Sequence, residues 1–195
     1  MTRFLSAWLL VGAVATTAAA QDSVDIRLVH GSATEQQTRD QLQRLLKAYD
    51  VSRWIYTKSI AIDDAAIPHS HPVLTLHTRH LKDDALLLST FVHEQFHWFL
   101  DQKETETTQA IKELRQRFPS VPTAPPDGAN GEESTYLHLL DCYLEYRVDQ
   151  QLLGELVTRQ VMEFWAADHY RWVYRTVLDR TRDIGEIVAK YKLRP

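Results

Sequence analysis

The sequence is nearly free of cysteine, because Cys142 is the only one in 195 residues. A single cysteine excludes an internal disulfide, so a hydrophobic core or a bound metal has to supply the stability of the fold. Basic residues form no block either, and the formal net charge is −4 with both signs spread along the chain. This distribution predicts no nucleic-acid partner.

The sequence also lacks an apolar run long enough to anchor its N-terminal region in a membrane. Residues 4 to about 15 are apolar and follow a single basic residue, but a membrane-spanning helix needs roughly 20 residues. Ala18 and Ala20 then form a site typical of signal-peptide cleavage. We therefore predict that residues 1–20 are a signal peptide. Residues 21–195 are expected to form a single domain, exported to a periplasm or secreted, with no membrane anchor after cleavage.

The pattern of apolar residues predicts an α+β fold. Short strands are expected over residues 23–31, 52–63 and 71–78, and helices over residues 33–50, 83–102, 104–119 and 134–191, with a break at Gly154. A proline-rich loop, residues 119–131, separates two of the helices. This order indicates a small N-terminal mixed sheet packed on a central helix, followed by a helical C-terminal half.

The central helix, residues 83–102, is apolar nearly all round and yet carries His93, Glu94 and His97. Ionisable side chains in such a helix are costly unless something binds them. They form an H-E-x-x-H motif, which places both imidazoles on one helix face, one turn apart. Both rings can then bind one zinc ion, and Glu94 can act as general base toward a metal-bound water. The expected cofactor is therefore Zn²⁺.

A catalytic zinc needs a third protein ligand, and the helix that follows the proline-rich loop offers several. Glu145 can bind the metal, and Asp149, one turn beyond, can accept the other ring N–H of a metal-bound histidine and so orient it. His138, Asp141 and Glu145 share one face of this helix, at positions i, i+3 and i+7. His138 is therefore a rival to Glu145 as the third ligand.

The H-E-x-x-H motif, followed on a later helix by a Glu-x-x-x-Asp pair, resembles the gluzincin (thermolysin-like) zinc metallopeptidases. The residues that carry the resemblance are His93, Glu94, His97, Glu145 and Asp149. The match covers about residues 72–149, and it departs from the family at Leu144, where these enzymes usually have asparagine. The resemblance implies a zincin-like fold in which an edge strand, here residues 71–78, holds an extended peptide by backbone hydrogen bonds.

The resemblance also implies a group that stabilises the oxyanion, for which zincins commonly use Tyr, His or Arg. The candidates on the last helices are Tyr136, Tyr143, His169, Tyr170, Arg171 and Tyr174. Of these, His169 and Tyr170 are the expected catalytic residues. Four further histidines flank the third predicted strand and either line a cleft or lie on the surface: His69, His71, His77 and His80.

These features predict an exported zinc-dependent hydrolase, a metallopeptidase that acts on a peptide or protein substrate with Glu94 as general base. The alternative is a non-catalytic zincin-like module, in which the metal holds a small helical domain together and the domain binds a protein or cell-wall partner. Glu94 favours the hydrolase, because a purely structural site has no use for a general base. The sequence does not indicate the identity of the substrate or the oligomeric state.

Overall fold

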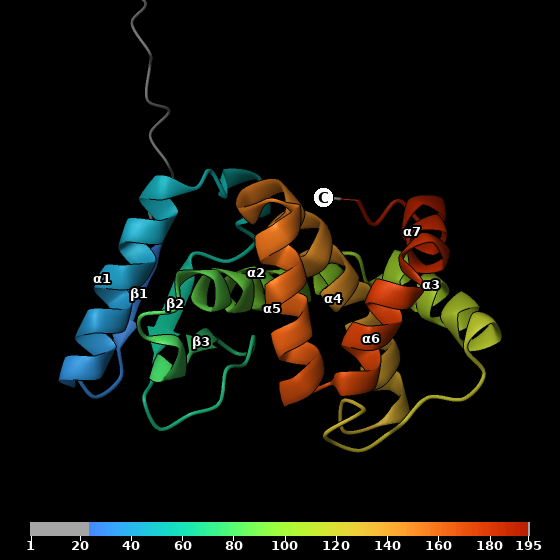
Figure 1. Ribbon diagram of the computed structural model, residues 1–195, viewed down its shortest axis with the longest axis horizontal. Helices are drawn as coiled ribbons and strands as arrows, with labels where there is room; N and C mark the ends of the chain where they lie inside the picture. The colour runs from blue at the N-terminus through green and yellow to red at the C-terminus, as the bar shows by residue number, and fades with distance from the viewer. Residues whose placement is uncertain (1–23, 195) are drawn as a thin grey trace, which may run out of the picture.

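The computed structural model describes residues 24–194 (Figure 1). The predicted signal peptide, residues 1–20, lies outside this range. Within it, three short strands come in the first half of the chain and α-helices make up most of the remainder, so the prediction of an α+β fold is confirmed. None of the helices in this range is long and apolar enough to cross a membrane.

The strands form one small sheet in the order β1-β2-β3, made of β1 (Asp25–Leu28), β2 (Ser59–Ile62) and β3 (Leu74–Leu76). Both strand pairs are parallel, so the predicted mixed sheet is wrong. The connections explain the direction. The helix α1 (Ala33–Ala48) returns the chain from the end of β1 to the start of β2, and the loop of residues 63–73 does the same between β2 and β3.

The outer edge of β3 is partly occupied by the loop that precedes it. The backbone N–H of Thr75 donates to the carbonyl of His69 at 2.8 Å, and the N–H of His69 donates to the carbonyl of Thr75 at 3.1 Å. These two residues form an isolated antiparallel bridge. A further strand therefore cannot pair with β3 at Thr75.

The second strand is shorter than predicted: residues 52–63 were expected, and β2 covers only Ser59–Ile62. Its first residues form a turn of 3-10 helix, η1 (Ser52–Trp54), and only its last residues join the sheet. Trp54 explains the difference, because its aromatic ring is buried in the core from this turn rather than from a pleated strand. The aromatic and β-branched residues at the start of this segment therefore pack in the core without pairing as a β-strand.

The helix α2 (Asp84–Gln102) runs through the middle of the molecule, after a turn of 3-10 helix, η2 (Thr78–His80) (Figure 1). Asp83 caps it by accepting a hydrogen bond from the N–H of Leu86 at 3.0 Å. The helix packs against the sheet and α1 on one side and against α4 and α5 on the other. It is therefore apolar nearly all round, which is the pattern of a helix buried on every side.

The C-terminal half is a group of helices arranged around α4. Its members are α3 (Glu104–Arg117), α4 (Glu132–Leu153), α5 (Glu155–Asp168), α6 (Arg171–Asp179) and α7 (Thr181–Lys190). α4 contacts α2 and each of the other four helices of this group. The predicted break after α4 is confirmed at Gly154, whose φ of 78° lies in the left-handed region that glycine adopts without strain. The long helices α2 and α4, side by side, position the site described next.

Candidate metal centre

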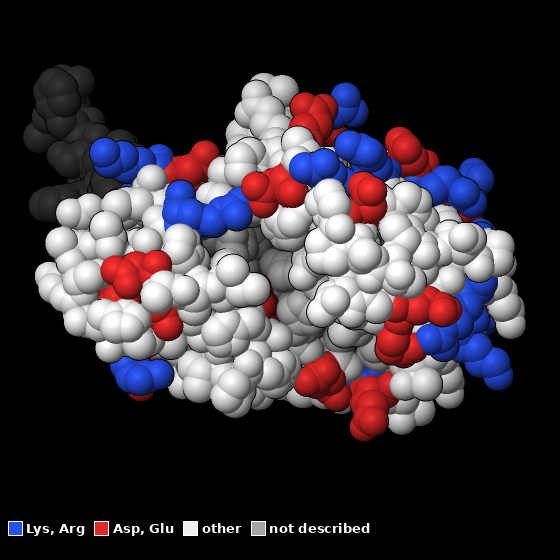
Figure 2. Space-filling model, turned by 90° about the horizontal axis from the view of Figure 1, so that it is seen from below, with Lys and Arg blue, Asp and Glu red and all other residues white. Residues whose placement is uncertain are grey.

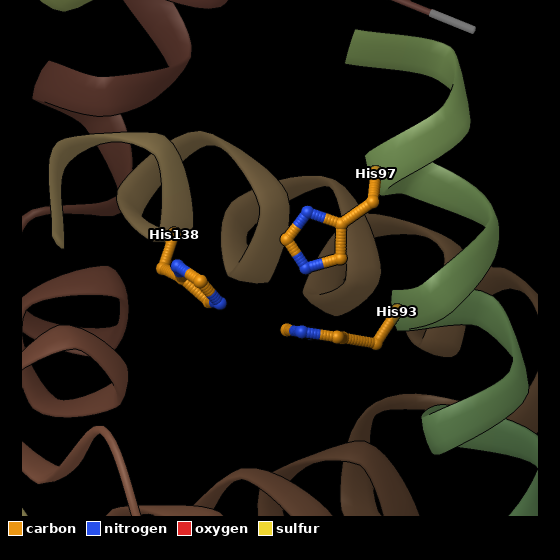
Figure 3. Close-up of side chains that lie close together, drawn as sticks. All are labelled: His93, His97 and His138. Atoms are coloured by element: carbon orange, nitrogen blue, oxygen red, sulfur yellow. The ribbon is translucent and has the colours of Figure 1, made fainter. Parts of the chain in front are cut away.

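Three histidines from two helices converge where α2 and α4 pack together. His93 and His97 project from successive turns of α2, and His138 projects toward them from α4 (Figure 3). One ring nitrogen of each lies within 4.8 Å of the others. The spacing of H-E-x-x-H therefore does what the sequence predicts and places both α2 imidazoles on one face, and α4 adds a third.

Hydrogen bonds to the Nδ1 atoms fix the orientation of two of these rings, those of His93 and His138. The Nδ1 of His93 lies 3.0 Å from a carboxylate oxygen of Glu145, and the Nδ1 of His138 lies 2.7 Å from the carbonyl oxygen of Ser134. Both partners can only accept, so each Nδ1 carries a proton, and in the neutral ring Nε2 keeps its lone pair. This tautomer is the one in which Nε2 can bind a metal, because the opposite N–H is held by an oxygen acceptor.

Glu145 is fully buried and is held in place by three side chains. Its carboxylate accepts from the Nδ1 of His93 and from the hydroxyl of Tyr174, each at 3.0 Å, and from the hydroxyl of Ser89 at 2.5 Å. The Ser89 hydroxyl in turn accepts from the indole N–H of Trp165 at 3.0 Å. Glu145 thus connects α2 with α5 and α6, and it fixes the orientation of His93.

A second buried carboxylate, that of Asp141, faces the Nε2 atoms of His93 and His97. Its Oδ2 lies 2.8 Å from the Nε2 of His97 and 3.6 Å from the Nε2 of His93. The side chain has no exposed surface, and neither oxygen has a hydrogen-bond partner of regular geometry among the residues that the structure describes. The Nε2 atoms of His93 and His97 therefore meet at this carboxylate.

The electrostatics of the site reflect two buried carboxylates beside three imidazoles, of which those of His93 and His138 are buried and that of His97 is partly exposed. Burial lowers the pKa of His93 and of His97, but the charge of Asp141 opposes burial, and both pKa values lie above the ordinary 6.5. Burial and the neighbouring imidazoles lower the pKa of His138 to about 3, so this ring is neutral. Burial also raises the pKa of Glu94. Negative charge held in a desolvated site of this kind suits a divalent cation.

The three histidines lie in the wall of a cavity of about 490 Å³. Figure 2, which views the molecule from below, shows a hollow between the N-terminal part on the left and the helical part on the right. The wall is formed by Ile67, Pro68, His69, Ser70, Arg79, His80, Thr90, His93, Glu94, His97, Pro125, His138, Glu145, Trp165, Asp168, His169, Tyr170 and Tyr174. A molecule that enters this cavity therefore meets the candidate metal ligands and Glu94 together.

The two predicted oxyanion-stabilising residues also line the cavity. The Nδ1 of His169 lies 2.8 Å from the carboxylate of Asp168, which also accepts from Arg79 at 2.7 Å. The carboxylate therefore holds the proton of His169 on Nδ1 and leaves Nε2 as the free polar atom of the ring. Tyr170 lies closest to the histidine cluster, with its ring centroid 4.3 Å from that of His138.

Tyr170 is held by the proline-rich loop. It has left-handed backbone angles, φ 47° and ψ 39°, immediately before α6. The first N–H groups of α6 donate to the loop carbonyls of Pro126 and Asp127, at 2.9 and 3.2 Å. Left-handed backbone is costly for a side chain such as tyrosine, so the surrounding contacts must maintain it. The loop thus forms part of the site, since Pro125 lies in the cavity wall.

The structure brings most of the predicted site residues together and leaves others apart. His93, Glu94, His97, Glu145, His169 and Tyr170 all line the cavity, as do the rival ligand His138 and two of the flanking histidines, His69 and His80. The ring N–H of His93 goes to Glu145 and not to Asp149, which is buried one turn further along α4.

Asp141 was not predicted to have a role of its own, although its position three residues after His138, on the same helical face, was the available signal. The pair between Arg79 and Asp168 joins residues too far apart in the chain for any local pattern to indicate it.

The chain matches no model of a protein family, no curated protein and no solved structure. Its function is therefore inferred from the side chains of the site.

Proposed function

We propose that the chain is an exported zinc-dependent hydrolase, a metallopeptidase with a zincin-like active site that cleaves a peptide or protein substrate. One observation carries the proposal: His93, His97 and His138 converge in the wall of a cavity that Glu94 also lines. A metal held by imidazoles, a carboxylate base beside it and space for a substrate are the parts that metal-assisted hydrolysis requires.

In this proposal His93, His97 and His138 would hold the zinc. His138 takes the place that the sequence analysis gave to Glu145, for two reasons. The Nδ1 of His138 is occupied by the carbonyl of Ser134, which leaves its Nε2 free. Glu145 instead accepts the Nδ1–H of His93 and is occupied by two further hydroxyl donors. Glu145 then has the orienting role that the sequence analysis assigned to Asp149.

Zinc bound at these residues would lower the pKa of a water ligand toward ~7 and polarise the carbonyl of the scissile bond. Glu94 takes the proton of the attacking water and returns it to the leaving amine. Because burial raises the pKa of Glu94, its protonated form is easier to reach than that of an exposed glutamate. Tyr170 donates a hydrogen bond to the oxygen that gains negative charge, and His169, positioned by Asp168, donates a second one from Nε2 when both of its ring nitrogens are protonated.

The substrate lies against the loop before β3 and not against β3 itself. The resemblance to gluzincins implies an edge strand that pairs with the peptide, but Thr75 of β3 already pairs with His69. Residues 67–70 lie in the cavity wall, and no residue of β3 does. The backbone nearest the substrate is therefore that of residues 67–70.

We also propose that residues 1–20 direct export and are then removed, so that the hydrolase acts in a periplasm or outside the cell. Amino-terminal sequencing of the protein after expression in a bacterial host, from the cell and from its periplasmic fraction, tests this. An exported protein that begins at Gln21 is the expected result, and a full-length protein retained in the cytoplasm would contradict it.

The proposed activity is tested with the purified mature chain. Elemental analysis should find one zinc per chain, and hydrolysis of a fluorescent generic protein substrate should stop when a chelator is added. Glu94→Gln should retain the zinc and lose hydrolysis, because the amide keeps the shape of the side chain but cannot take a proton. Glu163→Gln, an exposed position on α5, is the matched control and should hydrolyse as the wild type does. Equal rates for Glu94→Gln and the wild type would exclude Glu94 as the base.

A second candidate is the non-catalytic zincin-like module. One observation favours it: the Oδ2 of Asp141 lies beside the Nε2 atoms of His93 and His97, so four protein donors are available, as in a closed structural site. This candidate predicts a zinc-containing protein with no chelator-sensitive hydrolysis of any peptide substrate, and the assay above separates the two.

A further inference from the structure

Asp141 is a buried carboxylate whose only recorded ion partners, among residues 24–194, are the two histidines of α2. No lysine or arginine in this range pairs with it, and no donor of regular geometry reaches either oxygen. A buried carboxylate without such partners is costly in free energy. Glu145, one turn further along α4, shows the contrast, because three donors satisfy its oxygens. Among the described side chains only the imidazoles of His93 and His97 can supply positive charge to Asp141, and a cation held by those imidazoles would supply it without their protonation.

The position of Asp141 shows where that charge belongs. Its Oδ2 lies 2.8 Å from the Nε2 of His97 and 3.6 Å from the Nε2 of His93. Two ligands of one five-coordinate zinc ion, each about 2.0–2.1 Å from it, are separated by roughly 2.9 Å at an angle of 90° and by roughly 3.5 Å at 120°. The two measured separations lie close to these two values. The oxygen thus occupies a ligand position relative to both nitrogens.

We propose that Asp141 is a fourth protein ligand, so that the metal is held by three imidazoles and one carboxylate: His93, His97, His138 and Asp141. This inference deepens the proposed function and rests on it. It gives Asp141 the ligand role that gluzincins give to a glutamate, while Glu145 stays outside the ligand set and orients His93. The site therefore differs from the two-histidine, one-glutamate set of that family.

The fourth ligand is compatible with hydrolysis. Asp141 is not among the residues of the cavity wall, whereas the three histidines and Glu94 are. The carboxylate thus reaches the metal from within the protein, and the cavity side remains available for a water ligand. One carboxylate also leaves a divalent ion with a net charge of about +1, as a two-histidine, one-glutamate site does. Five ligands, four from the chain and one water, are the expected set.

Zinc affinity of full mature-chain variants, measured by competition with a calibrated chelator, tests the inference. Asp141→Asn should lower the affinity by more than 100-fold, beyond the ~10–100-fold that loss of a group outside the ligand set causes. Asp149→Asn is the matched control, because Asp149 is equally buried on the same helix, and its affinity should stay within tenfold of the wild type. An Asp141→Asn protein that holds zinc as tightly as Asp149→Asn would overturn the inference.

A measurement on the wild type keeps the inference testable if Asp141→Asn fails to fold. X-ray absorption at the zinc edge should give five nitrogen or oxygen neighbours, with outer-shell scattering from three imidazoles. Four neighbours with three imidazoles, together with no shift of a carboxylate stretching band on zinc binding in difference infrared spectra, would show that Asp141 does not bind the metal and would leave the proposed hydrolase standing. Zinc with five neighbours but no hydrolysis would support the ligand set and overturn the hydrolase. A wild-type chain that binds no zinc would overturn both.

Discussion

Glu145 of α4 accepts a hydrogen bond from the Nδ1 of His93 of α2, with 3.0 Å between nitrogen and oxygen. The other nitrogen of the same ring, Nε2, lies toward Asp141. A carboxylate in the first position fixes the tautomer and the direction of the imidazole and increases its basicity as a ligand. The two acidic residues of α4 therefore act on opposite sides of one histidine, although they are only one helical turn apart.

This relationship predicts different effects for two substitutions on α4. His138→Ala removes a proposed ligand and should weaken zinc binding by far more than 100-fold. Glu145→Gln keeps the size of the side chain but loses the charge that orients His93, so zinc affinity should fall by only ~10–100-fold. Competition with a calibrated chelator measures both. The assignment of His138 fails if Glu145→Gln loses the metal and His138→Ala retains it.

The hydrogen bonds of Glu145 also predict a stability effect away from the metal. Tyr174 is buried, and its hydroxyl donates to Glu145. Tyr174→Phe should lower the free energy of unfolding by about 1–3 kcal/mol, since it removes a hydrogen bond to a charged group in the interior. Urea unfolding followed by circular dichroism measures the change. Tyr146→Phe, which removes a hydroxyl that accepts from Gln150 on a half-buried part of α4, should cost clearly less.

Removal of the metal should destabilise the whole fold. His93 and His97 lie on the helix at the centre of the core, so zinc that binds only the folded chain adds its binding free energy to the free energy of unfolding. A chelator should lower the Tm of the wild type by several degrees or more. In His97→Ala the chelator should change nothing, because the metal is already lost. Identical Tm values for the wild type with and without chelator would show that no metal is coupled to folding.

The sequence was sufficient to predict the central helix and to predict that its two histidines lie on one face. The stretch around His93 and His97 is long, apolar on every face and capped by Asp83, and these signals are local to the segment. The direction of the strands, in contrast, could not be predicted from local sequence. The alternation of residues in β1 or β2 is the same in a parallel and an antiparallel pair, and only the paths of α1 and the loop of residues 63–73 decide between them.

The sequence limits the metal ligand on α4 to a few candidates but does not decide between them. His138, Asp141 and Glu145 lie on one helical face, so any of them could point at a metal bound to α2. The choice depends on how α4 is rotated and placed against α2, which is set by packing far from the motif. The contacts of Glu145 with Ser89, from α2, and with Tyr174, from α6, are of this kind.

A pH dependence of stability is expected at the ends of β1 and β2, where His30 lies 3.0 Å from Glu35. The hydrogen bond that His30 donates to the carboxylate of Glu35 raises the pKa of His30 above its ordinary 6.5. Burial pushes the pKa of Glu35 up, but hydrogen bonds from His30, Gly31 and Asp64 together bring it below 4.5. The contribution of His30 to the free energy of unfolding is fully present below pH 6.5 and is lost as the pH rises through its raised pKa. That of Glu35 is full above pH 4.5 and is lost as the pH falls through its lowered pKa.

The difference in stability between the wild type and His30→Gln should therefore be largest between pH 4.5 and 6.5 and should shrink on both sides. Urea midpoints of the two proteins, measured across this range at constant ionic strength, give the difference. Because both proteins keep the histidines of the metal site, the pH dependence of that site cancels. A difference that does not change with pH would show that the pair contributes no charge-dependent stability.

The last prediction separates catalysis from metal binding at His169. Its Nδ1 is held by Asp168, and the ring lies in the cavity wall, but none of its hydrogen bonds or ring contacts within residues 24–194 is with the three histidines of the candidate metal centre. If the protonated ring donates from Nε2 to the oxyanion, His169→Ala should lower kcat by ~10²–10³-fold and leave zinc affinity unchanged. Asp168→Asn should lower kcat less, because the imidazole remains but loses the carboxylate that stabilises its protonated form. His71→Ala, a histidine stacked on Trp98 outside the cavity wall, is the control and should keep full activity. A loss of zinc in His169→Ala would instead make this residue part of the metal site, and unchanged kcat would remove it from the mechanism.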